Sequence, residues 1–262
     1  IDSYLASLEE DQQNLGKFLI TYVLTQNEKK NVLKPPNDNG WYQVLANYLF
    51  DEVGNFRQDR KPLAVITFNY DRSLEAFLNI YHTGVYNHKN RNTIKTLKQS
   101  WCEIKKELPI IHVHGMLGSY PKVSYGIKER PEVLSRHSKE IKIIHELKGH
   151  FEGFVSKAFK RANDYLLESN KIVFMGFGFH KENIARLNFF NLNNMRYIQE
   201  IVCAFGDMTD HEISRMLKDV DNKHLSTAIN DAQQKRLARN GKCNLMARQI
   251  EIFELTGRSW RY

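Results

Sequence analysis

The sequence is poor in cysteine and contains no long apolar run. Its three cysteines, Cys102, Cys203 and Cys243, lie far apart with no C-x-x-C pair. This spacing excludes a four-cysteine zinc ribbon and offers no disulfide framework. No apolar run approaches the ~20 residues that cross a bilayer, and residues 1–4 lack the features of a signal peptide. We therefore expect no membrane segment and a cytoplasmic location.

The overall composition is that of a globular protein. Hydrophobic residues make up 42% of the 262 positions and charged residues 26%, which is ordinary usage for a packed domain. We expect a single domain over residues 1–262, without a metal site. The net charge of +8 suits either a face for nucleic acid or an acidic partner, or a solvated basic surface. The basic residues gather at two places: His88, Lys89, Arg91, Lys95, Lys98, Lys105 and Lys106, and later Lys235, Arg236, Arg239 and Lys242.

Residues 1–60 are expected to be mainly helical. Apolar residues recur at helical spacing in two segments, which predicts two amphipathic helices. They are Leu15, Phe18, Leu19, Tyr22 and Val23 in the first segment, and Trp41, Val44, Leu45, Tyr48 and Leu49 in the second. A polar loop rich in proline and asparagine, residues 34–40, separates them.

The rest of the chain alternates short apolar runs with helical patterns. Near-continuous hydrophobicity in these runs favours strands buried on both faces, as in a parallel sheet. We expect strands at 63–68, 110–114, 171–175 and 201–205, and a weaker one at 250–255. Helices are predicted near residues 151–166 and after a capping box that begins at Thr209. The fold class is therefore α/β: a Rossmann-like doubly wound parallel sheet with a helical insertion or small helical module and no zinc ribbon.

Polar and glycine residues come directly after the first three predicted strands. Because ligands of open parallel sheets bind beyond the carboxyl ends of the strands, these residues are expected to meet at one edge. The three sets are Asn69-Tyr70-Asp71, His114-Gly115 and Gly176-Phe177-Gly178.

Each set has a structural and a functional interpretation. Asn69 and Asp71 suit a turn, since both side chains bond their own backbone, or a ligand amide. His112 and His114 are two residues apart on a predicted strand and would face one side, as core histidines or as a metal pair. His114 is the better candidate for acid–base chemistry because it ends the strand and precedes Gly115, which would let a ligand approach.

The third set is glycine-rich. Gly176 and Gly178 permit close approach of the backbone to a phosphate or ribose, although such turns are common between strand and helix. Asn183, five residues further on, suits a helix cap or a contact with a ribose hydroxyl.

Taken in order, these motifs resemble the sirtuin superfamily. Residues 67–71 (TFNYD) match the family's T-x-N-x-D segment, His114-Gly115 its HG, and residues 176–178 the position of its G-T-S. The segments ITFNYDRSLE, HVHG and GFGF are more similar to bacterial sirtuin-like NAD hydrolases of antiphage defence than to deacylases. The resemblance covers roughly residues 63–205 and the helical opening.

The resemblance implies NAD as the substrate and assigns roles to the matched residues. His114 would be the catalytic histidine at the nicotinamide ribose, and Asn69 would position the water or the ribose. Asp71 would hold the nicotinamide carboxamide, with Thr67 lining the same pocket. The remaining residues implied in NAD binding are Gly115, Gly176, Gly178 and Asn183.

Two features of the family are not found in this sequence. The first is the Gly-rich G-A-G-x-S loop that binds the pyrophosphate. Residues 1–5 resemble the family's segment just after that loop, so we expect the first strand and this loop to precede residue 1. The second is the zinc ribbon of deacylases, and its absence favours hydrolysis of NAD over deacylation.

Two alternatives stay open: a non-catalytic subunit that binds NAD, ADP-ribose or nucleic acid, and an NAD-dependent protein deacylase. The resemblance also suggests a homo-oligomer and a partner defence protein, such as an ATPase or a nucleic-acid-sensing subunit.

Overall fold

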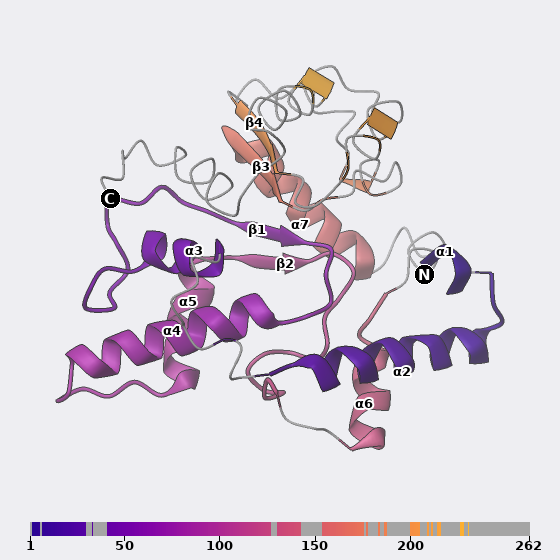
Figure 1. Ribbon diagram of the computed structural model, residues 1–262, viewed down its shortest axis with the longest axis horizontal. Helices are drawn as coiled ribbons and strands as arrows, with labels where there is room; N and C mark the ends of the chain where they lie inside the picture. The colour runs from indigo at the N-terminus through magenta and orange to yellow at the C-terminus, as the bar shows by residue number, and fades with distance from the viewer. Residues whose placement is uncertain are drawn as a thin grey trace. The chain divides into compact units, whose positions relative to one another are not determined.

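The computed structural model divides the chain into two compact units, Ile1–Ala158 and Phe159–Tyr262, and each is described by itself. The residues that it describes are 2–5, 7–29, 33, 41–126, 130–142, 154–175, 177, 183, 186–187, 200–204, 209, 211, 214–215, 226–227 and 230. Strands and helices alternate along much of the chain, so the fold is mixed α/β (Figure 1). None of the helices in this described part combines the length and apolar character needed to cross a bilayer.

The first unit contains helices and a two-stranded sheet. In chain order the elements are α1 (Asp2–Leu5), α2 (Glu10–Asn27), α3 (Trp41–Leu49), β1 (Val65–Thr67), α4 (Ser73–Lys89), α5 (Leu97–Glu107), β2 (Ile110–His112) and α6 (Pro131–Ser138). The start of α5 is fixed by a capping box, in which Thr96 and Gln99 exchange side-chain to backbone hydrogen bonds of 3.3 and 2.9 Å. Helices α3, α4 and α5 enclose the hydrophobic core, which includes Leu49, Leu78 and Ile104.

Both observed pairs of strands are parallel, as the apolar runs predict. β1 pairs with β2, and in the second unit β3 (Lys171–Met175) pairs with β4 (Glu200–Ala204). Helix α7 (Phe154–Glu168) precedes β3, as its apolar spacing predicts. Among the described residues the four strands form two separate two-stranded sheets, so a single doubly wound sheet stays a prediction. The predicted strand at 250–255 and the bounds of the helix after Thr209 lie outside the described residues.

Helix α2 forms where the sequence predicts it, but with its apolar face turned outward. Leu15, Leu19, Tyr22 and Val23 are exposed, whereas the buried residues of the helix are Lys17, Thr21 and Thr25. Burial of this polar face is tolerated because the threonine hydroxyls donate to the helix's own carbonyls: Thr21 Oγ1 to Lys17 O at 2.8 Å and Thr25 Oγ1 to Thr21 O at 2.6 Å. Periodicity therefore identified the helix but not the face that it buries.

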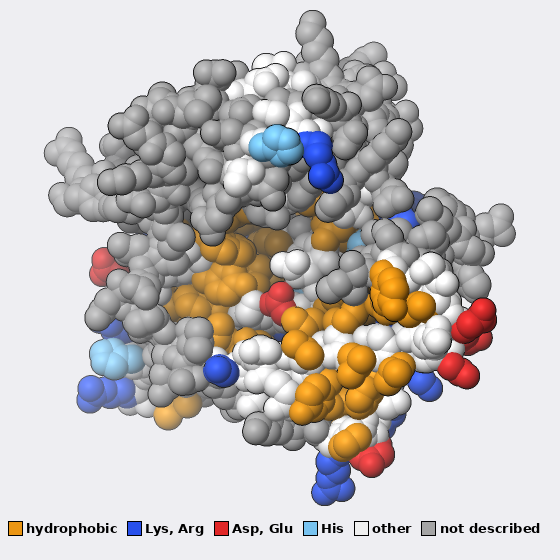
Figure 2. Space-filling view, turned by 45° about the vertical axis from the view of Figure 1, so that its right-hand side comes forward, with side chains coloured by type: hydrophobic (Ala, Val, Ile, Leu, Met, Phe, Trp, Pro, Cys, Tyr) orange, Lys and Arg blue, Asp and Glu red, His pale blue; other side chains and the backbone are white. Residues whose placement is uncertain are grey.

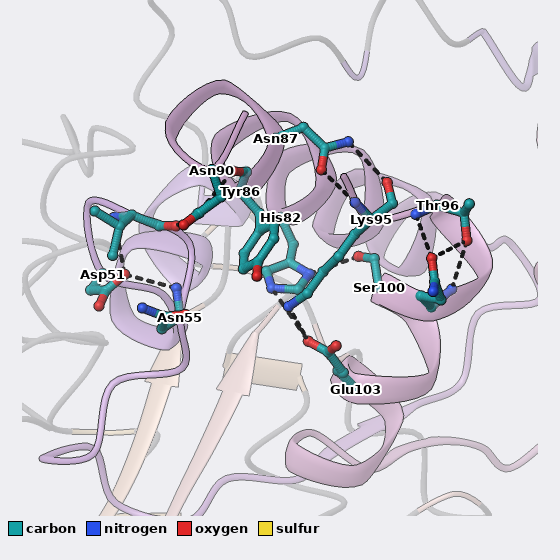
Figure 3. Close-up of polar contacts among 12 residues, drawn as sticks. Asp51, Asn55, His82, Tyr86, Asn87, Asn90, Lys95, Thr96, Ser100 and Glu103 are labelled. Atoms are coloured by element: carbon teal, nitrogen blue, oxygen red, sulfur yellow. Dashed lines mark hydrogen bonds and ion pairs between the residues drawn. The ribbon is translucent and has the colours of Figure 1, made fainter. Parts of the chain in front are cut away.

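A polar network fastens α4 to α5 (Figure 3). His82 of α4, fully buried, lies 2.7 Å from the hydroxyl of Ser100 on α5. Lys95 forms an ion pair of 2.7 Å with Glu103 and its ammonium lies 3.6 Å from the centre of the Tyr86 ring. Burial, followed by the charge of Lys95, lowers the pKa of His82. Lys95, one of the clustered basic residues, therefore serves the internal structure of this unit.

Candidate functional site

The register of β1 and β2 brings two of the three polar sets together. Val65, Ile66 and Thr67 lie opposite Ile110, Ile111 and His112, and the pairing extends one step further, where Val113 N donates to Thr67 O at 3.0 Å. Since the strands are parallel, residues 69–71 and 113–115 leave the sheet at the same carboxyl edge. This juxtaposition, over more than 40 residues of sequence, is the one that the strand positions predict.

The loop after β1 is fixed by its own side chains. The hydroxyl of Thr67 accepts from Asn69 N at 3.1 Å. The Asp71 carboxylate accepts from Ser73 N at 3.0 Å and from the Ser73 hydroxyl, which starts α4 with an Asx turn. The turn interpretation of Asp71 is thus confirmed, while Asn69 keeps an exposed side chain.

A half-buried tyrosine extends this Asp71 contact. Tyr42 of α3 lies 2.6 Å from the Ser73 hydroxyl, and because that hydroxyl already donates to Asp71, Tyr42 is the donor. Burial, reinforced by the negative charges of Asp71 and Glu75, raises the pKa of Tyr42 to about 12. Tyr42 therefore stays a neutral hydrogen-bond donor at physiological pH and holds one end of the loop.

His114 lies just beyond β2, in the turn at residues 113–114. The strand ends at His112, so the expectation that both histidines lie on the strand is wrong for His114. The side chain of His114 is buried, 3% exposed, with the ring of Phe68 at 5.2 Å between centroids and that of Tyr70 at 6.3 Å. The motif histidine therefore lies under the two aromatic residues that flank Asn69.

The glycine after His114 has a structural reason of its own. Gly115 has a φ of 82°, and a Cβ at this position would lie 1.9 Å from the carbonyl oxygen of Glu140. Lys142 N also donates to His114 O at 2.8 Å, so residues 140–142 pack against the turn that carries His114 and Gly115. The space that the missing side chain leaves is used by this backbone, rather than by a ligand as the sequence suggested.

His112 forms an ion pair that the sequence analysis did not find. Its Nε2 lies 2.5 Å from Glu75 Oε1 and its Nδ1 lies 2.8 Å from the carbonyl oxygen of Asn69. Both neighbours are acceptors, so both ring nitrogens donate and the imidazole is a cation. Burial acts to lower the pKa of His112, but the hydrogen bond and charge of Glu75, with smaller contributions from Asn69 and Asp71, raise it overall. A sequence signal for this pair was an acid, Glu75, flanked by the apolar buried residues Leu74, Ala76, Phe77 and Leu78.

This ion pair predicts a pH-dependent contribution to stability. The pKa of His112 in the folded chain lies above the ~6.5 of an unfolded histidine, so protonation favours the folded state. The unfolding free energy of wild type minus that of His112→Gln should be largest below pH ~6.5 and should fall as pH rises through the folded pKa. Urea unfolding of both proteins at a series of pH values around ~6.5 measures this difference. The pH-dependent contribution of His82 is the same in both proteins and cancels. A difference that grows with pH would contradict the ion pair.

A second buried ion pair joins the loop after β1 to the C-terminal end of α2. Arg72, 1% exposed, donates to both carboxylate oxygens of Glu28, with Nη2 at 2.8 and 2.7 Å, and to the carbonyl of Val123 at 2.7 Å. Gly126 N donates to the same carboxylate at 3.1 Å. The residue after Asp71 is thereby tied to the end of α2 and to the loop at 123–126. Sequence reasoning missed this pair, whose members are 44 residues apart.

The third polar set belongs to the second unit. Gly176 and Gly178 lie outside the described residues. Asn183 is helical, and its carbonyl accepts from Leu187 N at 3.0 Å. The meeting of this set with Asn69 and His114 thus stays a prediction. Within the described residues, no group of three or more His, Cys, Asp or Glu side chains could hold a metal ion.

Comparison with known proteins gives one match. A family model described as a SIR2-like domain matches residues 63–229, which is more than half of the chain and includes β1, β2, β3 and β4. No curated protein and no solved structure matches.

Proposed function

The chain belongs to the SIR2-like family, and from this we propose that it is an NAD glycohydrolase that releases nicotinamide and ADP-ribose. SIR2-like domains use NAD, so an NAD-related activity follows from membership. The observation that carries the proposal is the parallel register of β1 and β2, which puts the Asn69 and His114 segments at one carboxyl edge. In parallel sheets this edge is where nucleotides bind.

The loop after β1 is suited to hold the nicotinamide half. The exposed amide of Asn69 offers a donor and an acceptor for the attacking water or the ribose. Oδ1 of Asp71 is engaged by Ser73, which orients the carboxylate, and Oδ2 would accept from the carboxamide. Thr67 would line the same pocket, and its hydroxyl fixes the loop by accepting a hydrogen bond from the backbone nitrogen of Asn69. A loop fixed in this way lowers the cost of orienting substrate and water.

His114 would act on the nicotinamide ribose. A histidine has the proton affinity for acid–base work near neutral pH. Because its side chain is buried beside Phe68 and Tyr70, substrate entry requires neighbouring groups to move. Tyr70 is one of these groups, and its movement would break the 3.2 Å hydrogen bond from its hydroxyl to Lys142 O. Cleavage would pass through an oxocarbenium-like state, to which the chain supplies orientation and polar stabilisation.

The His112–Glu75 pair stabilises the loop that carries Asn69. Nδ1 of His112 donates to the carbonyl of Asn69 at 2.8 Å, so the position of the Asn69 side chain depends on a buried cation. The pair would act as a positioning element, with no direct contact to NAD. Gly176 and Gly178 would approach the adenosine half and Asn183 would contact a ribose hydroxyl, within a single sirtuin-like domain whose four strands form one doubly wound sheet.

We further propose that NAD depletion makes the protein a toxic effector of antiphage defence in the cytoplasm. The support is the similarity of its three motifs to defence-associated sirtuin-like hydrolases. A homo-oligomer and a partner ATPase or nucleic-acid-sensing subunit belong to the same proposal. Infection of cells that carry the gene, with NAD measured over time, tests this role separately from the chemistry.

The chemistry is tested by identifying the products. The chain is incubated with NAD, alone and with nucleic acid, and nicotinamide, ADP-ribose and O-acetyl-ADP-ribose are separated by chromatography in the presence and absence of an acetyl-lysine peptide. We expect equal amounts of nicotinamide and ADP-ribose, without dependence on the peptide. Products that require the peptide would identify a deacylase, and NAD binding with no product would identify a binding subunit.

A further inference from the structure

The connection between α4 and α5, residues 90–96, carries exposed apolar side chains. Ile94 within it is 70% exposed, and Leu97, the first residue of α5, is 48% exposed. Val53, which is 42% exposed, adjoins the same connection, since Asn90 Nδ2 donates to Val53 O at 3.1 Å. Single exposed apolar residues need no explanation, but three that adjoin one short connection indicate a contact surface.

Hydrogen bonds on both sides of Ile94 fix its outward position. On one side, Thr93 N donates to Asn90 O at 3.0 Å. On the other side, Lys95 and the Asn87 side chain exchange two hydrogen bonds, Lys95 N to Oδ1 at 2.8 Å and Nδ2 to Lys95 O at 2.9 Å (Figure 3). The connection is therefore ordered before any partner binds, which lowers the entropic cost of binding.

Cationic side chains flank these apolar residues. Lys89, Arg91 and Lys98 precede and follow Ile94 along the chain, and all three are exposed. Figure 2 shows Lys, Arg and His side chains at the lower left edge of the molecule, on the side where α4 ends. The surface around the connection is thus both apolar and basic.

Acidic groups offset little of this charge. Glu103 is the one acidic residue between positions 86 and 106, and it is paired with Lys95 at 2.7 Å. Glu52, the residue before Val53, is exposed and offsets one positive charge. The connection therefore keeps a net positive charge.

We propose that the connection between α4 and α5 docks on the surface of an anionic lipid bilayer. Ile94 and Leu97 enter the headgroup region, and the exposed cations Lys89, Arg91 and Lys98 lie against the lipid phosphates. Figure 1 shows the C-terminal end of α4 at the lower left edge of the first unit, where it can meet a flat surface. The cytoplasmic leaflet of a membrane carries the negative charge that this contact requires.

The combination of apolar and cationic side chains favours lipid over nucleic acid. The phosphates of a nucleic acid would attract the lysines equally well, but neither Ile94 nor Leu97 offers an aromatic ring on which bases stack. The interface of a bilayer accepts both kinds of side chain. This proposal goes beyond NAD hydrolysis and does not depend on it, because it rests on the α4–α5 connection and its test measures binding to vesicles.

The test is co-sedimentation of the whole chain with vesicles of phosphatidylcholine and with vesicles of equal parts phosphatidylcholine and phosphatidylglycerol. Wild type should bind only the anionic vesicles, and the bound fraction should fall with added salt because ions screen exposed charges. Ile94→Ser should lower the partition coefficient by about fivefold or more, and Lys98→Glu by about tenfold or more. Circular dichroism should be unchanged in both variants because both side chains are exposed.

Two substitutions of the same kind on other surfaces are the matched controls. Leu15→Ser changes an apolar residue of α2 that is 58% exposed, and Lys122→Glu reverses an exposed charge in the segment before α6. Both variants should keep wild-type binding. Absence of binding to anionic vesicles would overturn the proposal, as would binding that Ile94→Ser leaves unchanged. An oligonucleotide that binds where vesicles do not, and that Lys98→Glu releases, would identify nucleic acid as the occupant and overturn it too.

Discussion

Asn69→Ala is expected to reduce NAD turnover by roughly 10²- to 10³-fold, the usual loss on removal of one preorganised polar group from a reacting centre. The side chain of Asn69 is exposed, whereas its backbone makes the loop contacts: N to Thr67 Oγ1 at 3.1 Å and O to His112 Nδ1 at 2.8 Å. Alanine keeps both backbone contacts, so the fold should be unchanged and the loss should fall on kcat.

The control for this variant is another exposed asparagine. Asn92, in the connection between α4 and α5, lies outside the proposed site, and Asn92→Ala should retain wild-type turnover. Initial rates of nicotinamide release over a range of NAD concentrations separate kcat from KM. Wild-type kcat in Asn69→Ala would remove this side chain from the reaction.

Arg72→Met is expected to destabilise the first unit by about 3–5 kcal/mol. It leaves the Glu28 carboxylate buried, 3% exposed, without its cation, and leaves the Val123 carbonyl without the donor that Arg72 supplies. Removal of one partner is costly because the remaining charge has already lost its hydration.

The double variant Arg72→Met/Glu28→Leu should recover part of this loss, since apolar residues of similar volume can replace a buried ion pair. An ion pair with one exposed member provides the comparison: Arg60 is 9% exposed, but its partner Glu107 is 46% exposed, so Glu107→Gln should cost less than ~1 kcal/mol. Urea denaturation gives all four unfolding free energies. An Arg72→Met variant as stable as Glu107→Gln would contradict the importance of the buried pair.

The elements around the site could be predicted because their signals are local. The apolar runs at 63–68 and 110–114 correctly located β1 and β2, and a general rule about parallel sheets then put Asn69 and His114 at one edge. No single motif was specific for a family, but the order of the three motifs along the chain was. The match of a SIR2-like family model at residues 63–229 agrees with the family that this order indicated.

The contacts that stabilise the site could not be predicted, because they join residues distant in sequence. Nothing local links Arg72 to Glu28 or His112 to Glu75, and one sequence does not show which charges meet. Helix α2 shows the same limit: spacing groups Leu15 with Leu19, but the buried ion pair of Glu28 decides which side faces inward. Gly115 shows the converse, since its local motif suggested a ligand whereas a distant carbonyl, that of Glu140, uses the space.

The most direct test of the account is the rate of nicotinamide release from NAD by wild type and by His114→Ala, measured side by side on folded protein. We expect release by wild type and a loss of about 10²- to 10⁴-fold in the variant, the usual contribution of a positioned acid–base group. Equal rates in the two proteins, or no release by wild type alone or with nucleic acid, would contradict an NAD-cleaving site at the carboxyl edge of β1 and β2.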